Sequence, residues 1–233
     1  MKKVLFLLIG LFILSNPAMT YSQNDVTKFL GIPVDGGKEE FVKQLCSKGF
    51  SLIQGGENLL YGSDVLQGSF NGAEVYVVVI TNKDKVCRIM VSDISQLDER
   101  SIKIRFNKLC QQFENNQKYI ALDNYKIPDS ENLSYEMQVN KKRYEAAFQQ
   151  KAIDDPNSPI VIENIKSLIE KTYSPDKCQN LSDDEWREII IKYLVNASSK
   201  KSVWFMISEG SYGKYFITMF YDNEYNRANG EDL

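Results

Sequence analysis

Hydrophobic residues recur at helical spacing in four segments of the chain. In one of these, residues 98–115, the apolar residues Ile102, Phe106, Leu109 and Phe113 follow one another at intervals of four, three and four positions. This spacing places all of them on one face of a helix. The same pattern predicts further helices over residues 38–48, 159–172 and 182–197, each with one apolar face to bury.

Residues at the helix ends support these boundaries. Ser182 and Glu185 have the spacing of a capping box, in which each side chain binds the other residue's backbone N–H. Ser158 and Pro159 are a typical N-cap and first helical residue. Gly49 suits the left-handed turn that ends the first helix.

Strand-like segments lie between the helices. Asn71-Gly72 is typical of a tight hairpin turn, because both positions need a positive φ angle, and it joins two strands of a predicted meander. The last two strands are apolar on both faces, which is typical of central or covered strands. Residues 120–134 are rich in Asn, Asp and Pro and indicate a long surface connection. The predicted strands are 50–53, 59–61, 65–70, 74–81, 86–92, a hairpin of 135–139 with 144–149, and then 203–208 and 214–221.

Helices beside antiparallel strands in both halves of the chain predict an α+β fold, with antiparallel sheets and helices packed on one face. Residues 23–97 would form an N-terminal unit of one helix and a meander, and residues 98–221 a C-terminal α+β unit. The two could be similar helix-plus-sheet units, and a single continuous sheet fits the pattern nearly as well. Residues 222–233 are polar and are expected to form a loose tail.

The first 22 residues have the features of a secretory signal peptide. A cationic start at Lys2 and Lys3 precedes an apolar run from Val4 to Leu14, and the small residue Ser22 offers a cleavage point. The apolar run is shorter than the roughly 20 residues of a membrane-spanning helix, which disfavours an uncleaved anchor. We therefore expect cleavage after Ser22, a mature chain without a transmembrane segment, and a periplasmic or secreted location.

The chain contains no histidine, the usual general base near neutral pH and the usual transition-metal ligand. This excludes Ser-His-Asp and Cys-His catalytic sites and imidazole zinc sites. No glycine-rich phosphate loop follows a strand, so neither a metal nor a cofactor is predicted. The formal net charge is −3, and removing the two lysines of the signal peptide makes it −5, which disfavours a nucleic-acid partner.

Four cysteines permit two disulfides in an exported protein, with three connectivities that the sequence does not separate. Cys46 and Cys110 fall within apolar helix stripes, and Cys87 shares a strand face with apolar residues, so buried thiols are favoured at these positions. Cys178 lies in a polar loop. It is the candidate for a disulfide or a reactive thiol.

Acidic clusters are the remaining candidates for catalysis in a chain without histidine. A structural role explains most of them, since helix starts and turns favour carboxylates, so no catalytic residue is assigned. Aromatic residues gather late in the chain, and most fit strand alternation. Tyr212 on a turn and Tyr225 in the tail are the exposed ones that we expect to bind a partner. The acidic clusters are Asp154 with Asp155, Asp183 with Asp184 and Glu185, and Asp222, Glu224, Glu231 and Asp232.

Two motifs carry a resemblance to known sequences: LGIPVDG at residues 30–36 and FYDNEYNRANG at residues 220–230. They resemble uncharacterised exported proteins of Bacteroides-like bacteria. The resemblance implies a periplasmic or secreted setting, and it brings no known activity or site residues. The chain is more loosely similar to small helix-plus-sheet envelope modules, such as outer-membrane assembly lipoproteins and beta-lactamase-inhibitor proteins, which bind other proteins.

The leading hypothesis is a non-enzymatic binding module of the cell envelope that holds a protein or peptide on a sheet face or on exposed loops. The alternatives are a carboxylate-dependent hydrolase of glycan or peptide, which needs two carboxylates in a concave pocket, and a small-ligand binding protein, which needs a sizeable cavity.

Overall fold

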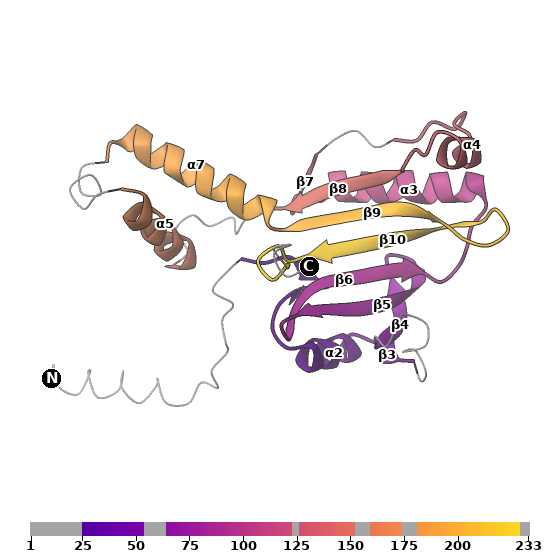
Figure 1. Cartoon of the computed structure of the whole chain (residues 1–233), viewed down its shortest axis with the longest axis horizontal. Coiled ribbons are helices and arrows are strands. Elements are labelled where there is room, and N and C mark those ends of the chain that lie inside the picture. Colours follow the sequence, from indigo (N-terminus) through magenta and orange to yellow (C-terminus); the bar gives the residue numbers. More distant parts are fainter. Residues whose placement is uncertain (1–24, 54–63, 123–125, 152–158, 174–180, 229–233) are drawn as a thin grey trace.

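The computed structural model describes residues 25–53, 64–122, 126–151, 159–173 and 181–228. A single antiparallel sheet of eight strands forms its centre, in the order β3-β4-β5-β6-β10-β9-β8-β7, and a separate two-stranded sheet pairs β1 with β2 (Figure 1). Helices pack beside the large sheet, so the predicted α+β fold is confirmed. The helices are α2 (Lys38–Ser47), α3 (Glu99–Glu114), α4 (Leu133–Gln138), α5 (Pro159–Thr172) and α7 (Asp183–Ser199).

The strand boundaries agree closely with the hydrophobic pattern in the first meander and at the end of the chain. Asn71 and Gly72 have φ angles of 52° and 77°, as the tight hairpin requires. The strands are β1 (Lys28–Phe29), β2 (Ile32–Pro33), β3 (Ser51–Leu52), β4 (Val65–Phe70), β5 (Ala73–Asn82), β6 (Lys85–Asp93), β7 (Tyr119–Ala121), β8 (Glu145–Gln150), β9 (Ser202–Glu209) and β10 (Tyr215–Asp222).

One helix and four antiparallel strands follow one another twice along the described chain, with α4, α5 and α7 added between the strands of the second set. The first set is α2 with β3 to β6, and the second is α3 with β7 to β10. The two sets meet where β6 pairs with β10, with Ser92 opposite Thr218 and Arg88 opposite Asp222. One continuous sheet therefore spans both halves. The division at residue 97 into two units stays a prediction.

One face of the sheet carries the main hydrophobic core. Phe205 on β9 is fully buried, and its ring lies 5.3 Å from that of Phe106 and 5.6 Å from that of Phe113, both on α3. Phe41 and Leu45 of α2 are buried in the same cluster. Because side chains alternate along a strand, the odd-numbered residues of β9 and β10 all belong to this helix-bearing face.

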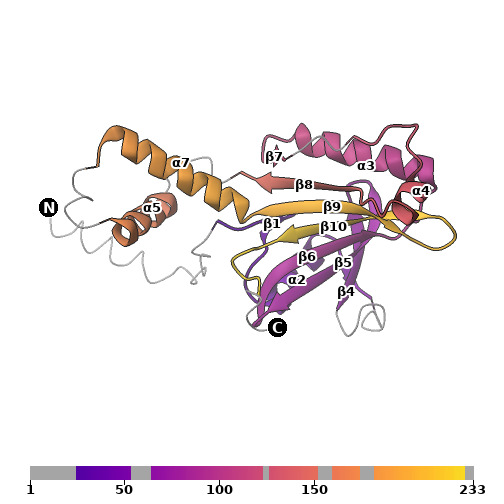
Figure 2. The ribbon, with the colours of Figure 1, turned by 45° about the horizontal axis from the view of Figure 1, so that its top comes forward.

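A helical hairpin, α5 and α7, is inserted between the paired strands β8 and β9 and extends beyond the end of the sheet (Figures 1 and 2). It has its own small core of Ile165, Ile169 and Ile189. The capping box at the start of α7 is confirmed: Ser182 N donates to Glu185 Oε2 at 2.8 Å, and Glu185 N donates to Ser182 Oγ at 3.3 Å.

The predicted hairpin of residues 135–139 with 144–149 is wrong in its first strand. Residues 133–138 form α4, whose N-cap Asn132 accepts a hydrogen bond from Tyr135 N at 2.9 Å. Only Leu133 of this helix is buried. Of the alternating residues that suggested a strand, Tyr135 and Val139 are exposed and only Met137 packs against the core. The partners of β8 are instead β9 and the short edge strand β7, which lies at the start of the predicted connection 120–134.

The prediction that Cys46 is buried is also wrong. Cys46 is exposed, because the ten-residue helix α2 buries only Phe41 and Leu45. Cys110 is buried as predicted, and Cys87 is half-buried. No disulfide joins these three cysteines, and Cys178, like residues 59–61 and Ser158, lies outside the described residues.

The first residues of the predicted loose tail are firmly packed. Asp222 ends β10 with 4% of its surface exposed, and Asn223 is 1% exposed. Asn223 Nδ2 donates to the carbonyl oxygen of Val34 at 2.7 Å, which ties the tail to the N-terminal segment. Asn226 Nδ2 bonds the carbonyl oxygen of Val86 at 2.8 Å. The described part of the chain includes no helix with the length and hydropathy to cross a membrane.

Candidate functional site on the open face of the sheet

The face of the sheet opposite α2 and α3, here called the open face, carries large apolar side chains that remain half-buried. The helices that pack on β5, β6 and β10 in the described chain are α2 and α3, and both lie on the other face (Figure 2). In β9, in β10 and in β5 and β6 up to the bulge at Ile80, the even-numbered residues therefore point to the open face. The large apolar ones that remain half-buried are Tyr76, Ile80, Met90, Trp204, Met206, Phe216 and Phe220.

A stack of three side chains lies on the open face, near the start of β9 and the end of β10. The rings of Trp204 and Phe220 are stacked, with centroids 4.1 Å apart and planes inclined by 19°. The guanidinium carbon of Arg88 lies 5.8 Å from the Trp204 ring and 5.2 Å from the Phe220 ring. Strand register explains the stack. Phe220 on β10 lies directly opposite Trp204 on β9, and Arg88 on β6 is the diagonal neighbour of Phe220.

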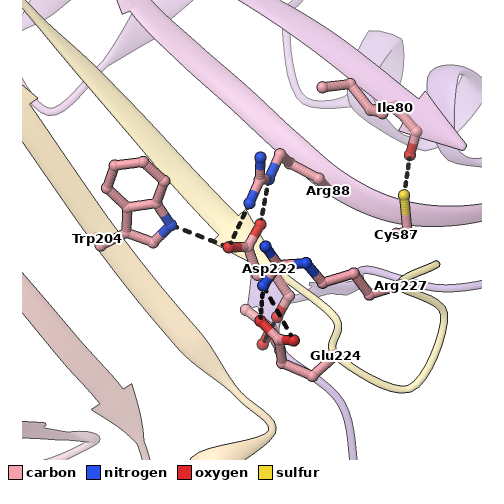
Figure 3. Close-up of polar contacts among 8 residues, drawn as sticks. Ile80, Cys87, Arg88, Trp204, Asp222, Glu224 and Arg227 are labelled. Carbon is pink, nitrogen blue, oxygen red and sulfur yellow. Dashed lines mark hydrogen bonds and ion pairs between the residues drawn. The ribbon is translucent and has the colours of Figure 1, made fainter. Parts of the chain in front are cut away.

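The carboxylate of Asp222 holds this stack in place (Figure 3). It accepts hydrogen bonds from Arg88 Nε at 2.5 Å and Nη2 at 2.9 Å, and from Trp204 Nε1 at 2.9 Å. The Asp222 side chain is 6% exposed and that of Arg88 is 28% exposed. The hydrogen bond to Asp222 raises the pKa of Arg88 above its ordinary value, so the guanidinium stays charged.

A hollow of about 400 Å³ borders the stack. Trp204, Arg88 and Asp222 form its aromatic and ionic wall, and Ala147 and Ser202 contribute small side chains. The opposite rim carries Glu145, Glu224 and Arg227, and Arg227 Nη1 lies 3.2 Å from Glu224 Oε1 (Figure 3). A preorganised aromatic platform beside a small charged hollow suits the insertion of one side chain from a partner.

The two tyrosines predicted to bind a partner lie at opposite ends of β10. Tyr212 is fully exposed at the tip of the β9–β10 turn, with a φ angle of 56°. Tyr225 follows the last residue of β10 and is 41% exposed, and burial raises its pKa, with Tyr193 and Asp25 adding to the effect. Eight strand residues separate them, which is about 25 Å at ~3.3 Å per residue. They therefore do not form one site, and a binding role for each stays a prediction.

The acidic clusters likewise lie in different parts of the molecule. Asp184 is exposed at the start of α7, 3.6 Å from Arg187, and Glu185 caps that helix. Asp222 and Glu224 line the hollow, while residues 154–155 and 231–232 lie outside the described residues. Within the described ranges, no three His, Cys, Asp or Glu side chains form a group that could hold a metal ion.

In the sequence, Trp204 and Phe220 are among the late aromatic residues that fit strand alternation, and Asp222 falls in the predicted loose tail. One signal was available: both aromatics are even-numbered, on the strand face opposite Phe205 and Ile217. The register that brings Arg88 beside them depends on the pairing of β6 with β10, which joins residues more than 120 positions apart.

Comparison of the chain with protein-family models, with curated proteins and with solved structures found no match. The functional conclusion therefore depends on the geometry of the site.

Proposed function

We propose that this protein is a non-enzymatic exported binding protein, and that the open face of its sheet holds a protein or peptide partner. The observation that carries the proposal is the Trp204–Phe220–Arg88 stack, in which Asp222 orients Arg88 and Trp204 through hydrogen bonds. Trp and Arg are the residues most enriched among binding hot spots, and rigid aromatic anchors lose little conformational entropy when a partner is bound.

The shape of the site favours a macromolecular partner over a small ligand. The half-buried apolar residues lie in cross-strand rows over β5, β6, β10 and β9, so they form a surface and not an enclosed cavity. The hollow beside Trp204, of about 400 Å³, opens onto this surface, so a partner that covers the surface can fill it. An apolar surface with a polar rim of Glu145 and Arg227 matches the ordinary anatomy of a protein interface.

The alternative of a carboxylate-dependent hydrolase has less support. Such an enzyme needs one carboxylate free to transfer a proton and a second free to attack or to activate water. Both oxygens of Asp222 already accept hydrogen bonds from Arg88, and Glu224 is paired with Arg227. Export itself is proposed from the signal-like residues 1–22.

Photo-crosslinking in native envelope extract tests the proposed function. A photoreactive amino acid replaces Met206 on the open face, or, as the matched control, Lys108 on the exposed side of α3. We expect an adduct of defined mass from position 206 and none from position 108. Trp204→Ala should reduce that adduct about 30-fold, the loss typical of a hot-spot residue. Equal adducts from both positions, or no adduct from position 206, would count against the proposal.

A further inference from the structure

A second and larger hollow lies on the helix-bearing face, separate from the open face. It measures about 820 Å³ and is bounded by three parts of the chain: the N-terminal segment 25–31, the turn between β4 and β5, and the end of α3 with the start of β7. Gln150 holds the N-terminal wall in place, because its Nε2 donates to the Lys28 carbonyl oxygen and its Oε1 accepts from Lys28 N, both at 2.9 Å.

The walls of this hollow are basic although the protein is acidic. Four lysines and one carboxylate are among its described lining residues, whereas the whole chain has a formal charge of −3. The carboxylate, Asp25, is 2.7 Å from the ammonium group of Lys201, a side chain only 4% exposed. The other three ammonium groups, those of Lys28, Lys118 and Lys151, are exposed and make no ion pair with a described residue. The hollow thus offers three positive charges, from three different segments, that no described carboxylate pairs with.

Aromatic rings form the floor of the hollow. Phe70 and Tyr119 are half-buried, and each is supported from behind by a buried ring, Phe29 at 5.1 Å and Phe113 at 4.7 Å. The Tyr119 hydroxyl accepts a hydrogen bond from Gln150 Nε2 at 3.1 Å, which fixes the orientation of this ring. Such supported rings present a flat surface on which the apolar face of a sugar ring can stack.

Amide side chains complete the site. Gln112 at the end of α3 and Asn71 at the tip of the hairpin turn both line the hollow, and each can donate and accept hydrogen bonds. Rings for stacking, amides for hydroxyl groups and separated lysines for negative charges occur together here. We propose that this hollow binds an acidic oligosaccharide, a short chain of sugar rings that carry carboxylate groups.

The character of the positive charges favours carboxylates over phosphate. Compact, doubly charged phosphate is usually bound by arginine forks or by the N-terminus of a helix. No arginine is among the described residues that line the hollow, and the helix end at its wall is the C-terminus of α3, which carries partial negative charge. Lysines spread around the opening match single charges that are spaced along a ligand.

Titration calorimetry on the full chain tests this site with three probes. The first is a trisaccharide of galacturonate, the second is the neutral trisaccharide of galactose with the same linkage, and the third is citrate, which has three carboxylates and no ring. We expect the acidic trisaccharide to bind at least about 10-fold more tightly than either of the others, with an affinity that falls as salt is added. Equal binding of the neutral sugar or of citrate, or no binding of the acidic trisaccharide, would overturn the proposal.

A matched pair of charge variants locates the binding. Lys118→Gln with Lys151→Gln removes two charges from the hollow, and Lys85→Gln with Lys108→Gln removes two exposed charges elsewhere. The first double variant should weaken binding of the acidic trisaccharide about 10-fold or more, and the second less than about twofold. Similar losses in both variants would mean that only the overall charge matters, which would contradict a built site. Binding on the open face is a separate measurement, so either proposal can fail alone.

Discussion

Different interactions hold the aromatic side chains in place on the two faces of the sheet. The neighbours Trp204 and Phe205 on β9 illustrate the difference. Phe205 is fully buried among rings supplied by α3 and β8, so packing alone holds it. Trp204 points to the open face, on which no described helix packs, and Phe220, Arg88 and Asp222 hold it there through stacking and hydrogen bonds.

This difference shows that an ordered aromatic surface does not require a second layer of helices. A buried ion pair at the edge of the stack supplies the fixed geometry instead, at positions that a partner can still reach. The helix-bearing face stabilises the fold, and the open face presents a rigid platform. Substitutions on the two faces should therefore differ in both stability and binding.

The largest expected effect is a substitution on the helix-bearing face. Phe205→Ala removes a fully buried ring and leaves a cavity among Phe106, Phe113 and Phe148, so it should cost about 4 kcal/mol of unfolding free energy. Trp204→Ala, one residue earlier, should cost about 2 kcal/mol, because it loses one stacking contact and one charge-assisted hydrogen bond. Urea unfolding of both variants measures the difference. If Trp204→Ala proved as costly as Phe205→Ala, the open face would belong to the core.

The next effect concerns the ion pair that orders the open face. Asp222→Asn should cost about 2–3 kcal/mol, because it leaves the partly buried Arg88 without its anion. The near-ultraviolet circular dichroism of Trp204 should weaken at the same time. Glu224→Gln is the control, since it affects a more exposed pair with Arg227 and should cost under about 0.5 kcal/mol. Equal costs for the two changes would show that Asp222 does not organise the stack.

Local patterns in the sequence predicted the elements well, but they could not predict which residues of distant strands meet. The helix stripe of α3, the Asn71-Gly72 turn and the capping box of α7 each depend on a few adjacent residues, and all are confirmed. The strand predicted over residues 135–139 was wrong, because alternation over only five residues does not distinguish a strand from a short exposed helix. The candidate site was missed because it depends on long-range register between β6 and β10.

A smaller effect is expected in the helical hairpin, whose core is separate from both faces of the sheet. Ile189 is 7% exposed and packs with Ile165 and Ile169. Ile189→Ala should therefore lower the local stability of α5 and α7 by about 1–2 kcal/mol, while the unfolding of the sheet changes little. Native-state hydrogen exchange measures both at once. Faster exchange throughout the strands would show that the hairpin is part of the same cooperative unit.

The smallest expected effect is chemical modification of the cysteines. Their alkylation rates report how well the helices shield the core on the helix-bearing face. Cys110 lies on the inner side of α3, and burial raises the pKa of its thiol to about 12, above its ordinary value of 9.0. Cys46 is exposed on α2, and Cys87 is half-buried on β6, where its thiol donates to the Ile80 carbonyl oxygen at 3.4 Å. Because the thiolate is the reactive form, iodoacetamide at pH 9 should alkylate Cys46 first, Cys87 more slowly, and Cys110 about 100-fold more slowly than Cys46.

Peptide mass mapping with and without urea measures these rates. In urea the three cysteines should react at similar rates. The raised pKa of Cys110 also makes the stability of the folded protein depend on pH. The folded state keeps the Cys110 proton to a higher pH than the unfolded chain does, so the contribution of this group is complete below pH 9.0 and declines as the pH rises toward about 12. Cys110→Ala should reduce that alkaline decline. Rapid alkylation of Cys110 in the native protein would mean that the helix-bearing face opens readily, and the contrast between the two faces would then lose its physical basis.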